Sequence, residues 1–129
     1  GDTIYTLSSE PNKLIAIDTE EGIDRIIDIL TPLVGNQVTL VRSQRDFLEM
    51  TAPNVSKGRA LVQLALDNNL SLENIVSFGN AENDISMLSE TGYSVAVSNA
   101  TEHVKSVANE VCGHHNEDGV AHWIEENLL

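Results

Sequence analysis

The sequence has 129 residues, of which 41% are hydrophobic, and its formal net charge at pH 7 is −13. This length and composition fit an ordinary globular protein with one compact domain. The negative charge argues against a nucleic-acid partner, because such binding depends on clustered lysine and arginine. The longest apolar runs fall far short of the roughly 20 residues that cross a bilayer, so we expect no membrane span and no membrane partner.

The cysteine content and the N-terminal residues predict the cellular compartment in which the protein resides. Cys112 is the single cysteine, so it cannot form a disulfide within the chain. It ends an apolar segment without a basic neighbour, which favours a buried, inert thiol. Residues 1–9 contain neither the basic segment nor the apolar segment of a secretion signal. These features predict a reducing, cytoplasmic setting.

The N-terminal part of the chain combines three expected strands with one expected helix. Apolar runs predict strands at residues 13–17, 37–41 and 47–50. The amphipathic pattern of residues 21–34, closed by Gly35, predicts a helix between the first two strands. Loop-forming residues at 51–55 then mark a candidate domain boundary.

From residue 56 the expected elements become alternating helices and strands. Helices are predicted at residues 57–69, 85–89, 101–108 and 120–128. Strands are predicted at residues 75–78 and 94–97, and a third, short strand ends at Cys112. This alternation predicts a parallel sheet covered by helices. In such sheets, catalytic groups gather at the carboxyl ends of the strands.

The most informative segment follows the strand at residues 75–78. After a glycine, the loop holds four oxygen-bearing side chains: Asn80, Glu82, Asn83 and Asp84. Hard cations such as Mg²⁺ bind oxygen ligands, and the end of a parallel strand is well placed to supply them. The alternative is an ordinary turn followed by a helix N-cap, for which the same residue types are suited.

Lys57 lies in the first turn of a predicted helix, where its charge opposes the helix dipole. Ser56 can cap this helix. An anion at the helix N-terminus would make the lysine favourable, because the ammonium and the free backbone N–H groups could bind it together. Gly58 supports close approach of another group to the backbone, since glycine is otherwise unfavourable in a helix. The alternative is a solvated surface lysine.

The four histidines do not form a recognisable metal-binding motif, and the single tryptophan fits a packing role. His114 and His115 lie in a turn-like segment without a cysteine or histidine partner at ligand spacing, which favours a solvated loop. His103 and His122 fall on expected helices, as surface or packing residues. Trp123 is expected to anchor the last helix by packing.

Six short segments together resemble one known family. In chain order they are residues 47–50 (FLEM), 55–58 (VSKG), 78–88 (FGNAENDISML), 95–100 (VAVSNA), 104–105 (VK) and 117–120 (EDGV). Their order and spacing are similar to those of the Cof-like branch of the haloacid dehalogenase superfamily. The resemblance implies an α/β fold. Residues 53–129 would form the C-terminal half of a Rossmannoid parallel sheet, the catalytic core, and residues 1–52 the later part of an α+β cap that selects substrates.

The activity that this resemblance implies is Mg²⁺-dependent hydrolysis of small phosphate monoesters, such as sugar phosphates, through an aspartyl-phosphate. Lys57 would be catalytic and would bind the phosphate, and Asn83 would also touch the phosphate. Asn80 would bind Mg²⁺ where the family usually has an aspartate, and Asp84 would support the metal site without touching the ion. These roles agree with phosphoryl transfer, in which positioning and electrostatic stabilisation supply most of the catalysis.

The sequence departs from the family pattern in two respects. The nucleophile motif DxDGT is absent, which predicts that the chain is a C-terminal fragment, inactive by itself. A cut sheet edge of such a fragment would favour pairing with another chain. In addition, Asn80 offers Mg²⁺ a neutral oxygen, which attracts the ion less than a carboxylate does.

Two alternative interpretations stay open. In one, the chain is a small capless phosphatase in which Asp18 ends the first strand as nucleophile and Ser43 follows the second strand. Against it, Asp18 also fits a strand-to-helix turn, and residues 19–21 lack the expected second aspartate and the Gly-Thr after it. In the other, the chain is a non-catalytic module that binds phosphate in a phosphatase-like fold, a hypothesis that Asn80 supports.

Overall fold

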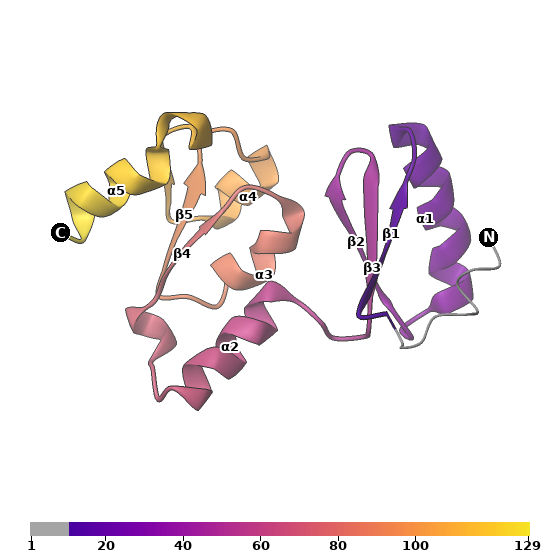
Figure 1. Ribbon diagram of the computed structural model, residues 1–129, viewed down its shortest axis with the longest axis horizontal. Coiled ribbons are helices and arrows are strands. Elements are labelled where there is room, and N and C mark those ends of the chain that lie inside the picture. Colours follow the sequence, from indigo (N-terminus) through magenta and orange to yellow (C-terminus); the bar gives the residue numbers. More distant parts are fainter. Residues whose placement is uncertain (1–10) are drawn as a thin grey trace. The chain divides into compact units, whose positions relative to one another are not determined.

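The structure is a computed structural model that describes residues 11–129 (Figure 1). The chain divides into two compact units, Gly1–Asn54 and Val55–Leu129. The assignment of residues 1–52 to a cap and of residues 53–129 to a catalytic core stays a prediction. Residues 1–9, considered above for a secretion signal, lie outside the described range. No helix within that range is both long and apolar enough to cross a membrane.

The first unit contains one helix and a three-stranded antiparallel sheet. In chain order its elements are β1 (Lys13–Ile17), α1 (Glu20–Val34), β2 (Thr39–Gln44) and β3 (Phe47–Thr51). Strand β3 lies between β1 and β2. Ile23 of α1 and Leu48 of β3 are 0% and 1% exposed. Arg42 of β2 lies opposite Leu48 in the strand register, and its guanidinium donates a hydrogen bond to the carboxylate of Asp24 in α1 at 2.6 Å. Helix α1 therefore covers the sheet face that carries Leu48.

The second strand differs from the expected range. The sequence pattern predicts it at residues 37–41, but β2 spans Thr39–Gln44. The turn after α1 extends through Gln37, whose N–H donates to the Val34 carbonyl at 2.9 Å. Strand β3 then pairs with β2 as far as Gln44, with a register shift at the end. Pairing with β3, which the local pattern does not contain, therefore sets the bounds of β2.

The second unit is the helix-covered parallel sheet that the alternating pattern predicts. Its helices are α2 (Lys57–Asp67), α3 (Ile85–Leu88), α4 (Glu102–Val107) and α5 (Gly119–Asn127), and its strands are β4 (Val76–Gly79), β5 (Tyr93–Val97) and β6 (Glu110–Cys112). Three short 3₁₀ helices lie in the connections: η2 (Leu72–Asn74), η3 (Glu82–Asp84) and η4 (His115–Glu117). The strand order is β4-β5-β6 with parallel pairing throughout, which confirms the predicted α/β fold class.

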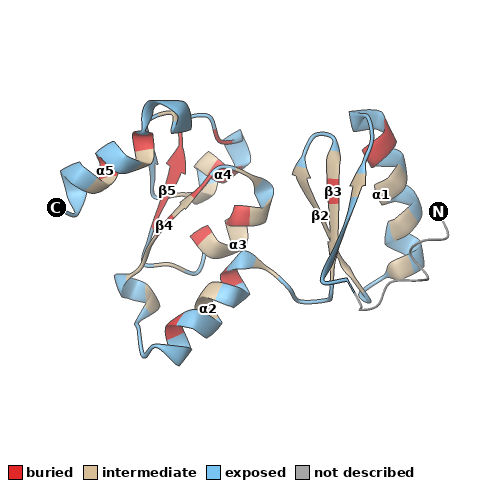
Figure 2. Cartoon of the chain, in the orientation of Figure 1, coloured by how far each residue is buried: buried red, intermediate tan, exposed pale blue. Residues whose placement is uncertain are grey.

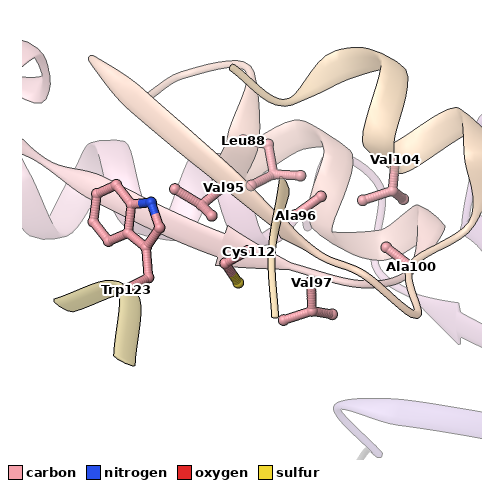
Figure 3. Packing of buried hydrophobic residues seen from close by; sticks show 8 residues of the cluster. All are labelled: Leu88, Val95, Ala96, Val97, Ala100, Val104, Cys112 and Trp123. Carbon is pink, nitrogen blue, oxygen red and sulfur yellow. The ribbon is translucent and has the colours of Figure 1, made fainter. Parts of the chain in front are cut away.

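The core of the second unit surrounds the central strand β5, most of which is buried (Figure 2). Val95 and Val97 are 0% and 5% exposed, and Figure 3 shows Cys112 and Trp123 close to this strand. The Trp123 Nε1–H donates to Glu110 at 3.0 Å, so packing and a hydrogen bond confirm Trp123 as the anchor of α5. Burial raises the pKa of the Cys112 thiol, as expected of an inert core cysteine.

Candidate functional site

The candidate site is a cavity of about 590 Å³ in the second unit. The polar side chains in its wall are Lys57, Asn80, Asp84 and His115, and the apolar ones are Phe78, Met87, Val97 and Val120. Asn80 follows β4 and His115 follows β6. The cavity therefore lies at the carboxyl ends of the parallel strands, where the sites of open α/β sheets form. Three of the predicted site residues meet there: Lys57, Asn80 and Asp84.

Asp84 is the buried anchor of the site, with 4% of the residue exposed. Its Oδ2 accepts the backbone N–H groups of Asn80 at 2.9 Å and of Ala81 at 3.1 Å. Its Oδ1 accepts a hydrogen bond from the Lys57 ammonium. Burial raises the pKa of Asp84, but these hydrogen bonds and the lysine charge together hold that pKa below its ordinary value. An ionised Asp84 therefore holds both the loop after β4 and the lysine.

Gly79 allows the loop after β4 to turn back closely on itself. A Cβ at this position would lie 2.8 Å from the Cβ of Asp84 and 3.0 Å from a methyl carbon of Leu88. Such contacts are closer than packed side chains tolerate. Glycine at the end of β4 therefore lets Asp84 fold back toward the backbone of Asn80.

Lys57 begins α2, whose N-cap residue Ser56 accepts a hydrogen bond from the Arg59 N–H at 3.2 Å. Helix α2 packs closely on α3. The Gly58 N–H donates to Ser86 Oγ at 3.1 Å, and a Cβ on Gly58 would collide with the Ser86 carbonyl group. The group that approaches Gly58 is thus a neighbouring helix and not an anion. Lys57 is half exposed, as a surface lysine would be, but its ammonium also pairs with the buried carboxylate of Asp84.

The cavity offers few oxygen ligands for Mg²⁺. Asn80 is exposed, and its carboxamide makes no hydrogen bond with the residues that the structure describes, so its oxygen can bind a ligand. Both oxygens of Asp84 are engaged, which suits support of the site more than direct coordination. Among residues 11–129, no three His, Cys, Asp or Glu side chains form a metal-binding group. The residues present fit one edge of a Mg²⁺ site, in which waters and phosphate oxygens commonly complete the coordination.

The other two polar side chains of the loop do not belong to the cavity wall. Glu82 accepts a hydrogen bond from Thr101 Oγ1 at 3.1 Å and lies 2.8 Å from His103 Nδ1, which ties the loop to the start of α4. Asn83 is partly buried in η3 and is not among the cavity-lining residues. Of the four site residues that the family resemblance implies, Asn83 is therefore the one that does not line the cavity.

His115 lines the cavity, although sequence reasoning assigned it only to a solvated loop. Its side chain is exposed, as in a loop, but it is also bound to Asn99 after β5. The His115 N–H donates to Asn99 Oδ1 at 3.2 Å, and its Nδ1 lies 2.6 Å from Asn99 Nδ2. The available signal was positional: His115 follows β6, and the carboxyl ends of parallel strands share one edge of the sheet.

Asp18 belongs to a different sheet. It follows β1 in the antiparallel sheet of the first unit, whereas Lys57 and Asp84 belong to the second unit. Its Oδ1 accepts the Thr19 N–H at 2.7 Å, and Thr19 caps α1 by accepting the Gly22 N–H at 3.1 Å. Asp18 therefore forms a strand-to-helix turn. The capless phosphatase, which needs the Asp18 strand in the parallel sheet, is contradicted.

Comparison with known proteins gives a consistent result. Residues 2–124 match the family model of the haloacid dehalogenase-like hydrolases. Phosphatase YwpJ of Bacillus subtilis is 41% identical over 73% of this chain and 33% of its own length. A HAD/COF-like hydrolase structure from Plasmodium vivax has a TM-score of 0.83 at 32% identity, over 88% of this chain and 40% of its own. The HAD subclass IIB sugar phosphatase BT4131 has a TM-score of 0.76 at 26% identity, over 92% and 44%.

The chain spans only part of these relatives. It covers 24%, 43% and 33% of the length of three curated proteins that it matches. The likeness therefore concerns a shared portion of the fold.

Proposed function

Because the chain belongs to the haloacid dehalogenase-like hydrolases, in their Cof-like branch, and holds a C-terminal portion of that fold, we propose that the full-length gene product hydrolyses small phosphate monoesters with Mg²⁺. The observation that carries this proposal is the Lys57–Asp84 ion pair in the wall of the strand-end cavity. A chain of net charge −13 repels phosphate esters in general. A positioned ammonium supplies the local attraction that such a substrate needs.

Each residue has a role in the proposed mechanism. Lys57 binds a phosphoryl oxygen and stabilises the charge that develops during transfer, and Asp84 keeps the ammonium in place. Asn80 contributes an oxygen ligand to Mg²⁺, which when bound neutralises phosphate charge. Asn83, on the same loop, is proposed as a further phosphate contact. Among the described residues, Asp84 is the one carboxylate that lines the cavity, and both its oxygens are engaged. We therefore propose that a segment outside this sequence supplies the attacking aspartate of an aspartyl-phosphate route.

Hydrolysis of an aryl phosphate by the full-length gene product with Mg²⁺ tests the role of Lys57. We expect Lys57→Ala to lower kcat/KM by about 100-fold or more, the usual effect of removing one preorganised stabilising group. Arg59→Ala, at an exposed position two residues further along α2, is the matched control and should change kcat/KM less than about twofold. Equal activity of Lys57→Ala and the wild type would refute the proposed role.

The proposed substrates are sugar phosphates or similar metabolites. One similar solved structure is a sugar phosphatase, and the cavity volume falls in the range of roughly 300–1,000 Å³ that is typical of small-molecule sites. Residues 1–52 are proposed to form part of the region that selects among these substrates. A cytoplasmic site of action is also proposed, on the ground that the single cysteine, Cys112, is a free thiol.

A non-catalytic phosphate-binding module is the second candidate, and the neutral side chain of Asn80 favours it. Titration of the full-length gene product with Mg²⁺ and with inorganic phosphate separates the two functions. Phosphate binding without Mg²⁺ binding or turnover would support the module. Mg²⁺-dependent turnover would exclude it.

A further inference from the structure

We infer that His115 is a specificity-determining residue, whose Nε2–H donates a hydrogen bond to an oxygen in the organic part of the substrate. This inference rests on the proposed function and extends it to a residue outside the predicted set. The evidence is its position in the cavity, its fixed pairing with Asn99 and the apolar side chains beside it.

The position of His115 favours contact with the organic part of a substrate. Lys57 and Asp84 form the charged part of the cavity wall, next to the end of β4. His115 follows β6, and β5 lies between these two strands. Neighbouring strands are about 4.8 Å apart, so the residues after β4 and β6 start roughly 10 Å from each other. A phosphoryl group held by Lys57 does not span that separation, but the ester that carries it does.

The pairing with Asn99 assigns the tautomer of His115. The backbone N–H of His115 can only donate, so the Asn99 atom at 3.2 Å from it is the carboxamide oxygen. The Asn99 amide nitrogen therefore faces His115 Nδ1, at 2.6 Å, and donates to it. An Nδ1 that accepts a hydrogen bond carries no proton, which places the proton of the neutral ring on Nε2. The contact with Asn99 thus leaves Nε2 as the ring nitrogen that can donate to a ligand.

The surroundings indicate which ligand group this donor recognises. Val97 and Val120 line the same cavity and offer no hydrogen bond from their side chains. A donor beside apolar side chains favours a substrate with an oxygen acceptor at that point, because the substrate without it leaves the donor unpaired. The hydroxyl groups of a sugar phosphate provide such acceptors, whereas the ring of an unsubstituted aryl phosphate does not.

The test compares two substrates in the full-length gene product with Mg²⁺: the best substrate from a panel of hexose and pentose phosphates, and phenyl phosphate. We expect His115→Phe to lower the ratio of kcat/KM for the sugar phosphate to that for phenyl phosphate about five- to tenfold, as for one lost neutral hydrogen bond. His115→Gln, which restores an N–H donor, should recover part of the ratio. His122→Gln, an exposed position on α5, should leave the ratio unchanged.

The outcomes separate this inference from the proposed function. A wild-type protein that hydrolyses neither substrate removes the proposed function, and the inference with it. An active wild type in which His115→Phe leaves the ratio unchanged, or lowers both rates by the same factor, refutes the inference alone. Imidazole ¹⁵N spectra give a second measurement without activity: an unprotonated Nδ1 in His115 supports the tautomer, and a protonated Nδ1 overturns it.

Discussion

At the scale of single residues, Asp84 links the stability of the second unit to pH. Its pKa in the folded protein is below the ordinary aspartate value. Its ionisation therefore favours the folded state above the unfolded pKa of about 4. This contribution is lost as the pH falls through the lower, folded pKa. Acid thus removes a carboxylate that accepts hydrogen bonds from Lys57, Asn80 and Ala81.

The variant Asp84→Asn should be less stable than the wild type by about 1–3 kcal/mol at pH 7, because one buried partner of these donors is lost. The difference should shrink as the pH falls below about 4, because the wild-type carboxylate takes up its proton as the pH passes through the lowered, folded pKa. Urea unfolding between pH 3 and pH 7 measures both effects. Asp28→Asn is the matched control, since Asp28 is exposed on α1. A stability gap for Asp84→Asn that does not change with pH would contradict the argument.

Asn80 sets the affinity for Mg²⁺ in the proposed site. Asn80→Asp adds a negative charge at the exposed end of β4, so we expect the Kd for Mg²⁺ to fall about tenfold, which corresponds to about 1.4 kcal/mol. Calorimetric titration of the full-length gene product measures this change. Asn74→Asp, at an exposed position in η2, is a control for the added charge alone. An equal change in both variants would show that net charge, and not coordination by residue 80, determines the affinity.

At the scale of elements, the contact between α2 and α3 fixes the residue beside Lys57. Alanine in place of Gly58 improves helix propensity by about 1 kcal/mol. Its Cβ, however, would collide with the Ser86 carbonyl. We expect the collision to prevail and Gly58→Ala to destabilise the protein by about 1–3 kcal/mol. The thermal unfolding temperatures of Gly58→Ala and of the exposed control variant Arg59→Ala, each compared with the wild type, test the sign of the effect. A higher unfolding temperature for Gly58→Ala would show that α2 and α3 can move apart without a loss of stability.

The sequence pattern predicts most elements because their signals are local. The strand at residues 13–17 and the start of α2 at Lys57 appear where periodicity and the Ser56 cap place them. The bounds of β2 were not predicted, since pairing with β3 determines them. The antiparallel order β1-β3-β2 also depends on contacts between distant segments.

The candidate site likewise contains residues that local sequence signals predict and a residue that depends on contacts between distant segments. Lys57 and Asp84 were found from motif and strand-end arguments, and the structure adds the ion pair between them. His115 was missed because its contact with Asn99 joins residues 16 positions apart, after two different strands. For Asn83 the motif predicted a site residue, but the side chain does not line the cavity, because a place in the motif does not determine where each side chain points.

At the scale of the whole molecule, the two units have unequal cores. The fully buried apolar side chains of the second unit surround β5, whereas those described in the first unit are Ile23 and Leu48. Ile15 and Ile17 of β1 are 47% and 68% exposed. Because the first unit has fewer buried apolar side chains, we expect its backbone hydrogen bonds to open at a lower free energy than those of the second unit.

Native-state hydrogen exchange of the 129-residue chain tests this inequality. Amides of β5 should exchange more slowly than those of β3, although each is the central strand of its sheet. The comparison of two central strands removes the effect of strand edges. Equal protection of β3 and β5 would mean that the two units unfold as one cooperative unit.

The contact between Gly113 and Gly119 closes the loop that carries His115. A Cβ on Gly119 would collide with the Gly113 carbonyl, and Asp118 has a φ of 53°, which few residue types adopt. Residues 114–117 carry no such backbone requirement. The backbone of the loop is therefore restricted at its base, whereas these two features place no restriction on which residues stand at 114–117.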